Sequence, residues 1–159
     1  MIYTVLPSPL GPLTVSAEDD TLTGLWLEGQ KYFAATLAPD ACRQDNAPIF
    51  AALARWLSDY FAGSTALCPL PLAPRGTAFQ RRIWDALREI PYGSAVTYGE
   101  LAQQLGSAPR AVGGAVGRNP ISIVIPCHRV VGSGGSLTGY AGGIDRKRFL
   151  LELEGVLQP

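Results

Sequence analysis

The spacing of apolar residues changes near residue 70, and this change limits the folds that the chain can adopt. Before that point, apolar residues alternate or cluster in short runs between turn-forming residues. These runs predict three strands, at Ile2–Leu6, Leu13–Ala17 and Leu22–Leu27. Apolar residues recur at helical spacing over 48–61, and the proline-rich stretch 68–76 is typical of a linker or an edge strand. We therefore predict an α/β chain with two lobes, residues 1–70 and residues 76–159.

The second lobe carries several helix signals. Two capping-box patterns mark helix starts, Thr77 with Gln80 and Thr97 with Glu100. Gly106 is expected to end the second of these helices, and after a short turn a further helix is predicted over about 110–118. Two short helices joined by so tight a turn predict a helix-turn-helix.

The last of these helices contains Gly113, Gly114 and Gly117. A glycine inside a helix is less favourable than alanine by about 1 kcal/mol, so three of them require a reason. Close approach of another backbone is one reason, and an ordinary helix pair packed at a glycine crossing is another. Residues 112, 115 and 116 are predicted to face inward.

Composition excludes several classes of protein. Hydrophobic residues make up 47% of the chain, enough for a real core, and the formal net charge is zero. A protein that coats nucleic acid non-specifically would carry an excess of positive charge. DNA binding would need a local basic face, and twelve of the thirteen basic residues lie at or beyond Arg43, although chance also explains that asymmetry. The N-terminus does not resemble a signal peptide and no apolar run is long enough for a membrane span, so we expect a soluble cytoplasmic protein without membrane contact.

Cysteine and histidine counts argue against a metal site. Cys42, Cys68 and Cys127 match no zinc spacing, and His128 is the single histidine. We expect no metal and no cofactor. An odd number of cysteines leaves at least one free thiol, and Cys127 has the most informative surroundings.

Cys127 follows an aliphatic run, 121–125, that we predict to be a buried strand ended by Pro126. A thiol is mostly protonated at neutral pH, so a nucleophilic cysteine needs a base or a positive environment, and His128 and Arg129 offer both. Neighbouring side chains on an extended strand point to opposite sides, so direct contact between Cys127 and His128 would need a bent backbone or a bridging water. Taken alone, a cysteine–histidine dipeptide is a weak signal and is more typical of a buried structural cysteine.

The longer pattern is far more specific. Pro126–Val130, preceded by Asn119-Pro120, resembles the active-site signature of the O6-alkylguanine-DNA alkyltransferases, also called methylated-DNA–protein-cysteine methyltransferases. The resemblance runs from residue 76 to residue 155 without a break. It includes the stretches 79–84, 90–93, 97–102, 110–115, 137–143 and 147–154. The first lobe is similar only in general pattern, at 8–13 and 60–63.

The resemblance implies a fold and a set of catalytic roles. The expected architecture is a small ribonuclease-H-like N-terminal lobe followed by a helical, winged helix-turn-helix C-terminal lobe. Cys127 would accept the alkyl group, His128 would deprotonate it through a water, and Glu154 would orient His128. Asn119 would brace the turn that carries the active site. Without the resemblance, Glu154 would be taken as a solvated charge near a helix end.

The resemblance also implies how double-stranded DNA with alkylated bases is bound. Arg110 would fill the space left by a flipped guanine and Tyr98 would help to rotate the nucleotide, because O6 inside the stack is out of reach of a buried thiol. Ala111, Gly113 and Gly114 would let their helix approach the backbone from the minor groove.

The base pocket would be formed by Tyr140, Ala141 and Gly142. Tyr140 would pack on the extruded base. Ala141 stands where some relatives have serine, so the substrate range, including activity on O4-alkylthymine, is open.

The resemblance implies repair of O6-alkylguanine by a monomer. Each molecule would act once, because the thioether formed on Cys127 has no good leaving group. Three other functions each fit part of the sequence. An alkyltransferase-like protein would bind lesions without an acceptor cysteine, a cysteine hydrolase would need an oxyanion hole and turnover, and a helix-turn-helix regulator would leave residues 126–129 without a purpose.

Overall fold

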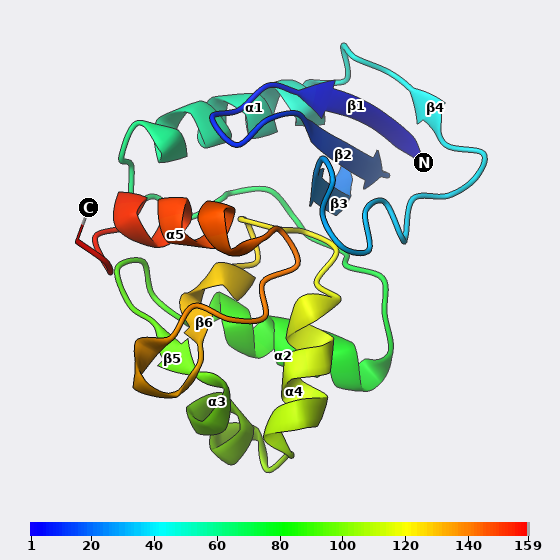
Figure 1. Ribbon diagram of the computed structural model, residues 1–159. Helices are drawn as coiled ribbons and strands as arrows, with labels where there is room; N and C mark the ends of the chain where they lie inside the picture. The colour runs from blue at the N-terminus through cyan, green and yellow to red at the C-terminus, as the bar shows by residue number, and fades with distance from the viewer. Residues whose placement is uncertain (159) are drawn as a thin grey trace. The chain divides into compact units, whose positions relative to one another are not determined.

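The chain forms two compact units (Figure 1). The computed structural model describes residues 1–158. The first unit comprises Met1–Arg75 together with Pro120–Val124, and the second comprises residues 76–119 together with 125–158. A short segment from the second half of the sequence therefore completes the first unit.

The first unit contains a four-stranded sheet with the order β3-β2-β1-β4. Its strands are β1 (Ile2–Leu6), β2 (Leu13–Glu18), β3 (Thr21–Leu27) and β4 (Cys42–Arg43). The β1–β2 and β2–β3 pairs are antiparallel, and β4 lies parallel to β1. The two residues between β2 and β3, Asp19 and Asp20, both have positive φ, as a tight hairpin turn requires. The three predicted strands are confirmed to within one residue at each end, and β4 is too short to have left a signal in the sequence.

The helix predicted over 48–61 is confirmed as α1 (Pro48–Phe61). Proline in its first turn lacks the N–H that would have no partner there, so it starts the helix without loss. Its apolar face is buried through Ile49, Phe50, Leu53, Leu57 and Tyr60. The proline-rich segment that follows is extended and touches β3 through a single bridge between Leu22 and Leu72.

The second unit begins with three helices, α2 (Ala78–Arg88), α3 (Tyr98–Leu105) and α4 (Pro109–Gly117). The predicted capping box at Thr77 and Gln80 is complete, whereas Thr97 accepts from the Glu100 N–H without a return bond from the Glu100 side chain. Gly106 ends α3 at φ 63°, and α4 follows after a short turn. The predicted helix-turn-helix is thus present, with residues 112, 115 and 116 buried as expected.

The remainder of the second unit contains two short strands, two 3-10 helices and one more α-helix. A two-stranded parallel sheet pairs β5 (Val96–Thr97) with β6 (Val130–Val131). The 3-10 helix η1 (Cys127–Arg129) precedes β6, η2 (Ser133–Gly135) follows it, and α5 (Ile144–Leu153) closes the unit. Among residues 1–158, no helix is both long and apolar enough to cross a membrane.

The prediction of a strand over residues 121–125 is wrong. The segment is buried, but it makes only one bridge, between Ile121 and Leu25, and then turns. Ile123 has φ 71°, a left-handed value that a strand cannot contain, and the Val124 N–H donates to the Ser122 carbonyl at 2.8 Å. The aliphatic composition of this segment predicted its burial correctly and its backbone conformation incorrectly.

Candidate active site

Cys127 lies at the first position of η1, at the end of a bent backbone. Pro126 has φ −81° and ψ 65°, and the Cys127 N–H donates to the Ile125 carbonyl at 2.8 Å, which is the geometry of an inverse γ-turn. The cysteine residue is 5% exposed. Its burial raises the pKa of the Cys127 thiol, because burial disfavours the charged thiolate. The turn therefore holds a buried thiol that needs a nearby base or a positive environment to ionise.

Two side chains oppose that effect of burial. A hydrogen bond from Asn119 and the charge of Lys147 both lower the pKa of Cys127. Asn119 also donates through Nδ2 to the Ile125 carbonyl at 2.8 Å, so it fastens the same turn that presents the cysteine. Asn119 is therefore joined by hydrogen bonds to both the cysteine and the backbone that precedes it.

His128 and Glu154 form a buried pair. His128 Nε2 lies 2.7 Å from Glu154 Oε2, and both side chains are 0% exposed. An ionised carboxylate can only accept, so Nε2 carries the hydrogen and Nδ1 keeps a lone pair. Nδ1 makes no hydrogen bond within residues 1–158. Burial lowers the pKa of His128, with Glu154 acting in the opposite direction, so the imidazole is neutral and can accept a proton at Nδ1.

Glu154 is placed by the end of α5. It follows the last helical residue, and Gly155 at φ 80° ends the helix in the left-handed conformation common at such positions. Glu154 is 4% exposed, so it is not a solvated charge.

Arg129 binds this carboxylate, a contact that the sequence did not reveal. Its Nε donates to Glu154 Oε1 at 2.7 Å, one terminal nitrogen donates to Oε2 at 3.1 Å, and the other donates to the Ile90 carbonyl at 2.7 Å. Such a two-pronged contact is the strongest arrangement available to arginine and a carboxylate. Arg129 and His128 therefore share one buried carboxylate.

Lys147 is the second functional candidate missed in the sequence. It is fully buried on α5 and donates to the Val130 carbonyl and, at 2.9 Å, to the Thr138 carbonyl. Burial lowers the pKa of Lys147 to about 8, and the proximity of Cys127 acts in the opposite direction. Its position three and four residues before Leu150 and Leu151 was the available signal, because that spacing places it on the buried face.

Tyr98 and Tyr140 lie near Cys127, and Ala141 and Gly142 follow Tyr140 in the chain. Tyr140 is 9% exposed, and its hydroxyl makes no hydrogen bond within the described chain. Burial, reinforced by Cys127, raises the pKa of Tyr140 well above its usual value and that of Tyr98 to about 12. Ala141 and Gly142 follow in the loop before α5 and are half-buried.

Four of the five residues expected to act on DNA lie on α4, and the fifth, Tyr98, begins α3. Arg110, Ala111 and Gly114 are exposed on α4, and Gly113 is half-buried. A Cβ added at Gly114 or Gly117 would meet no atom within 4 Å. Packing inside this chain therefore does not explain these two glycines, and the glycine-crossing interpretation fails for them.

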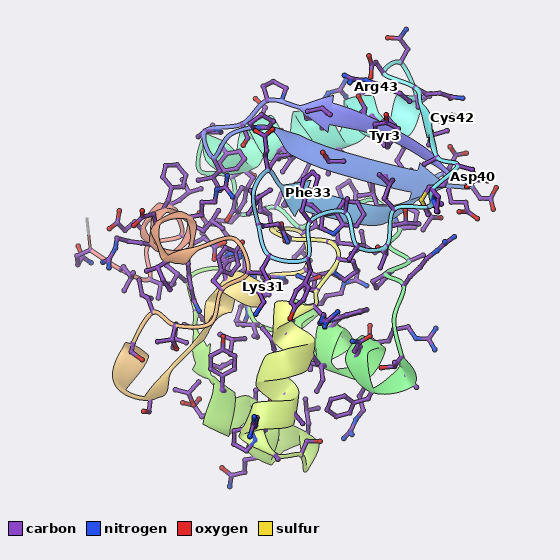
Figure 2. The ribbon with its side chains drawn as sticks, turned by 45° about the vertical axis from the view of Figure 1, so that its right-hand side comes forward. Tyr3, Lys31, Phe33, Asp40, Cys42 and Arg43 are labelled. Carbon is purple, nitrogen blue, oxygen red and sulfur yellow. The ribbon has the colours of Figure 1, made fainter. Side chains whose placement is uncertain are left out.

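The other two cysteines have different surroundings. Cys42 is exposed on β4 (Figure 2), where its sulfur donates to the Asp40 carbonyl at 3.8 Å. Cys68 is half-exposed. Of the three, Cys127 alone is placed beside a histidine, an asparagine and a lysine.

Two family models match the chain. Residues 1–74 match the ribonuclease-like domain of 6-O-methylguanine DNA methyltransferase, and residues 78–156 match its DNA-binding domain.

Curated relatives and a solved structure are similar over nearly the whole length. A methylated-DNA–protein-cysteine methyltransferase of Methanosarcina acetivorans is 46% identical over 98% of this chain and 99% of its own length. One from Haemophilus influenzae is also 46% identical, over 98% of this chain and 87% of its own. The crystal structure of Mycobacterium tuberculosis OGT in complex with DNA superposes with a TM-score of 0.89 at 46% identity, covering 98% of this chain and 93% of that one.

These matches confirm the predicted fold class, a ribonuclease-like N-terminal lobe followed by a helical C-terminal lobe. They also confirm the resemblance seen in the sequence. The chain belongs to the 6-O-methylguanine DNA methyltransferase family.

Proposed function

We propose that this protein repairs DNA by moving the alkyl group of O6-alkylguanine onto Cys127 in a single, irreversible turnover. The observation that carries this proposal is the neutral, buried His128 whose Nε2 is held by Glu154 at 2.7 Å and whose Nδ1 remains available. A cysteine one residue away, braced by Asn119, supplies the nucleophile. The names of the relatives, methylated-DNA–protein-cysteine methyltransferase, support the same reaction.

The chemistry follows from this arrangement. His128 Nδ1 takes the thiol proton through a bridging water, and the charge of Lys147 favours the resulting thiolate. The thiolate sulfur attacks the alkyl carbon, the bond between that carbon and O6 breaks, and the guanine leaves as an anion that regains the proton. The product on the protein is a thioether, which has no good leaving group, so each molecule acts once.

The charge distribution favours a DNA-binding role for the second unit. It carries nine basic and six acidic residues, whereas the first unit carries four basic and seven acidic residues. A net positive unit within a neutral chain attracts the phosphate backbone locally. The relative solved in complex with DNA supports DNA as the partner, which we propose to be double-stranded.

The α4 surface suits an approach through the minor groove without base reading. Ala111, Gly113 and Gly114 leave its exposed face almost without side chains, and Arg110 stands at its start. Arg110 would then replace the flipped nucleotide in the stack, and Tyr98 would help to turn that nucleotide towards Cys127. Tyr140, Ala141 and Gly142 would line the pocket for the base.

We further propose that the protein acts as a monomer, with residues 1–70 as one lobe and 76–159 as the alkyl-accepting lobe. Its three free cysteines favour a reducing compartment such as the cytoplasm. Alanine at position 141 leaves room for O4-alkylthymine as a second substrate.

Intact-mass spectrometry after incubation with duplex DNA containing O6-methylguanine tests this function. We expect one methyl group per protein, mapped to Cys127, with no further uptake when DNA is in excess. Cys127→Ser is expected to bind the same duplex and to gain no mass. An unmodified wild-type protein that still bound the lesion would indicate a damage sensor, and repeated turnover would indicate a different reaction. A duplex with O4-methylthymine, tested in parallel, decides the substrate range.

A further inference from the structure

Tyr98 and the loop before α5 contact each other closely. The Tyr98 hydroxyl donates to the Thr138 carbonyl at 3.2 Å and lies 3.5 Å from the Gly139 carbonyl. Lys147 donates to the same Thr138 carbonyl and places Nζ 5.8 Å from the centre of the Tyr98 ring. The tyrosine and the lysine therefore meet at one backbone carbonyl, one residue before Gly139.

Gly139 is required at its position for two independent reasons. Its φ is 73°, which disfavours any residue with a Cβ. A Cβ added there would lie 2.9 Å from the Tyr98 hydroxyl oxygen and 3.5 Å from Cζ of the ring. The first of these distances is too short for a stable contact, so either the tyrosine or the loop would have to move.

A second glycine lies along the other edge of the same ring. A Cβ added at Gly113 on α4 would lie 3.8 Å from Cδ1 of Tyr98, an ordinary contact. The ring of Tyr98 thus lies between Gly113 and Gly139, and only the Gly139 side is too tight for a side chain. The orientation of the tyrosine depends on the absence of a side chain at residue 139.

Resting on the function proposed above, we propose that Gly139 is a positioning residue that holds Tyr98 in the orientation needed to turn the damaged nucleotide towards Cys127. Gly139 is directly followed by Tyr140, the expected base-stacking residue, so one close contact sets both tyrosines relative to the pocket. Gly139 touches no substrate in this role and acts through Tyr98.

The chain offers a matched control for backbone strain. Gly134 has φ 70°, close to that of Gly139, yet a Cβ there would meet nothing within 4 Å. Gly134→Ala therefore introduces the same unfavourable φ without the steric contact. The Tyr98→Phe variant removes the hydroxyl that a Cβ at residue 139 would strike, leaving Cζ at 3.5 Å as the nearest ring atom.

The experiment is a double-mutant cycle on the full chain, with Gly139→Ala, Tyr98→Phe and the combined variant, beside Gly134→Ala. The single-turnover rate of methyl transfer from duplex DNA containing O6-methylguanine is measured for each. We expect Gly139→Ala to slow transfer at least about tenfold, since a displacement near 1 Å is enough for such a loss. Gly134→Ala should remain within about twofold of the wild type. In the Tyr98→Phe background, adding Gly139→Ala should slow transfer by less than about twofold, a clear departure from additivity.

A second readout separates positioning from a change in the thiol itself. Alkylation of Cys127 by iodoacetamide, followed by peptide mapping, needs no nucleotide to be turned. We expect this rate to be unchanged in Gly139→Ala. A parallel loss in both rates would overturn the positioning role, and so would equal losses in Gly139→Ala and Gly134→Ala or rates that multiply across the cycle.

The contact can also be judged without any substrate. Melting temperatures of the wild type, Gly139→Ala, Tyr98→Phe and the combined variant should show the same non-additivity. Tyr98→Phe should restore part of the stability lost in Gly139→Ala. If the wild-type protein took up no methyl group, the proposed function would fail, whereas additive melting temperatures would overturn the contact itself. The combined variant also keeps the test valid if Gly139→Ala alone does not fold.

Discussion

At the scale of single residues, the site depends on one buried carboxylate with two partners. Glu154 accepts from Arg129 through both oxygens and holds His128 at 2.7 Å. A buried charge of this kind is tolerated because it is paired and hydrogen-bonded, and removing one member leaves the other uncompensated. The orientation of His128 and the stability of the second unit therefore depend on the same side chain.

Replacing Glu154 tests this shared dependence. Glu154→Gln removes the charge opposite Arg129, so we expect the free energy of unfolding to fall by about 3 kcal/mol. Methyl transfer should slow by about 100-fold because the amide offers one acceptor oxygen to both Arg129 and His128, and its NH2 group cannot accept from His128 Nε2. Chemical denaturation and single-turnover kinetics measure the two effects. Glu152→Gln on the half-buried part of α5 is the control, and an equal loss in that variant would contradict the specific role of Glu154.

The pH dependence of the reaction should report on Lys147. The pKa of Lys147 is lowered to about 8 by burial, so its charge is present below that pH and lost above it. Burial raises the pKa of Cys127, and by itself this thiol would ionise increasingly as pH rises. Because the charge of Lys147 favours the thiolate, we expect the rate to level off or fall above pH about 8.

Lys147→Arg provides the comparison, since arginine stays charged at every accessible pH. Its transfer rate should continue to rise above the pH at which that of the wild type levels off. Identical pH profiles for the two proteins would show that the charge of Lys147 does not act on Cys127.

At the scale of elements, α4 contains glycines at positions where alanine would make the helix more stable. Gly114 and Gly117 face open space, so neither is required by packing within the chain. A helix that keeps such glycines loses stability relative to alanine without any internal benefit. We propose that Gly114 is kept for close contact with DNA.

Alanine at each of these positions separates stability from binding. Gly114→Ala and Gly117→Ala should each raise the free energy of unfolding by up to about 1 kcal/mol. We expect only Gly114→Ala to weaken binding to duplex DNA, because its methyl group would lie on the surface next to Ala111. Thermal unfolding and DNA titration at fixed salt concentration measure both effects. Equal DNA affinity for both variants and the wild type would remove Gly114 from the binding surface.

At the scale of the whole molecule, the two units do not correspond to two uninterrupted lengths of sequence. Pro120–Val124 belongs to the first unit, where the Leu25 N–H donates to the Pro120 carbonyl at 2.8 Å and the Ser122 N–H donates to the Leu25 carbonyl at 3.0 Å. Within this segment Ile121 and Ile123 are buried. The backbone that leads to Cys127 is therefore formed partly by contacts with residues 1–75.

A fragment of residues 76–159 should show this dependence. Without β3, Ile121 and Ile123 lose their burial, and the left-handed conformation of Ile123 loses the contacts that maintain it. We expect the fragment to aggregate or to transfer methyl groups at least about tenfold more slowly than the full chain. A full chain cleaved after folding between residues 74 and 76 is the control and should keep its activity. A fully active fragment would show that residues 120–124 need no partner.

Local signals in the sequence predicted several secondary-structure elements and the family correctly. The alternation in the first lobe, the spacing in α1 and the capping box at Thr77 predicted elements that the structure contains, because these signals act over a few neighbouring residues. The pattern around Pro126–Val130 indicated the family and named Cys127, His128, Asn119 and Glu154 as candidates.

The sequence did not predict the features that depend on contacts between residues distant in the chain. Composition could not show that residues 121–125 turn, because their conformation is set by a bridge to Leu25 almost one hundred residues earlier. Nor could it show that Arg129 binds Glu154, that Lys147 is buried beside Cys127, or that Gly139 faces Tyr98. Local signals specify helices and strands, whereas the pKa values and orientations of a site arise from burial and charge that only the folded chain brings together.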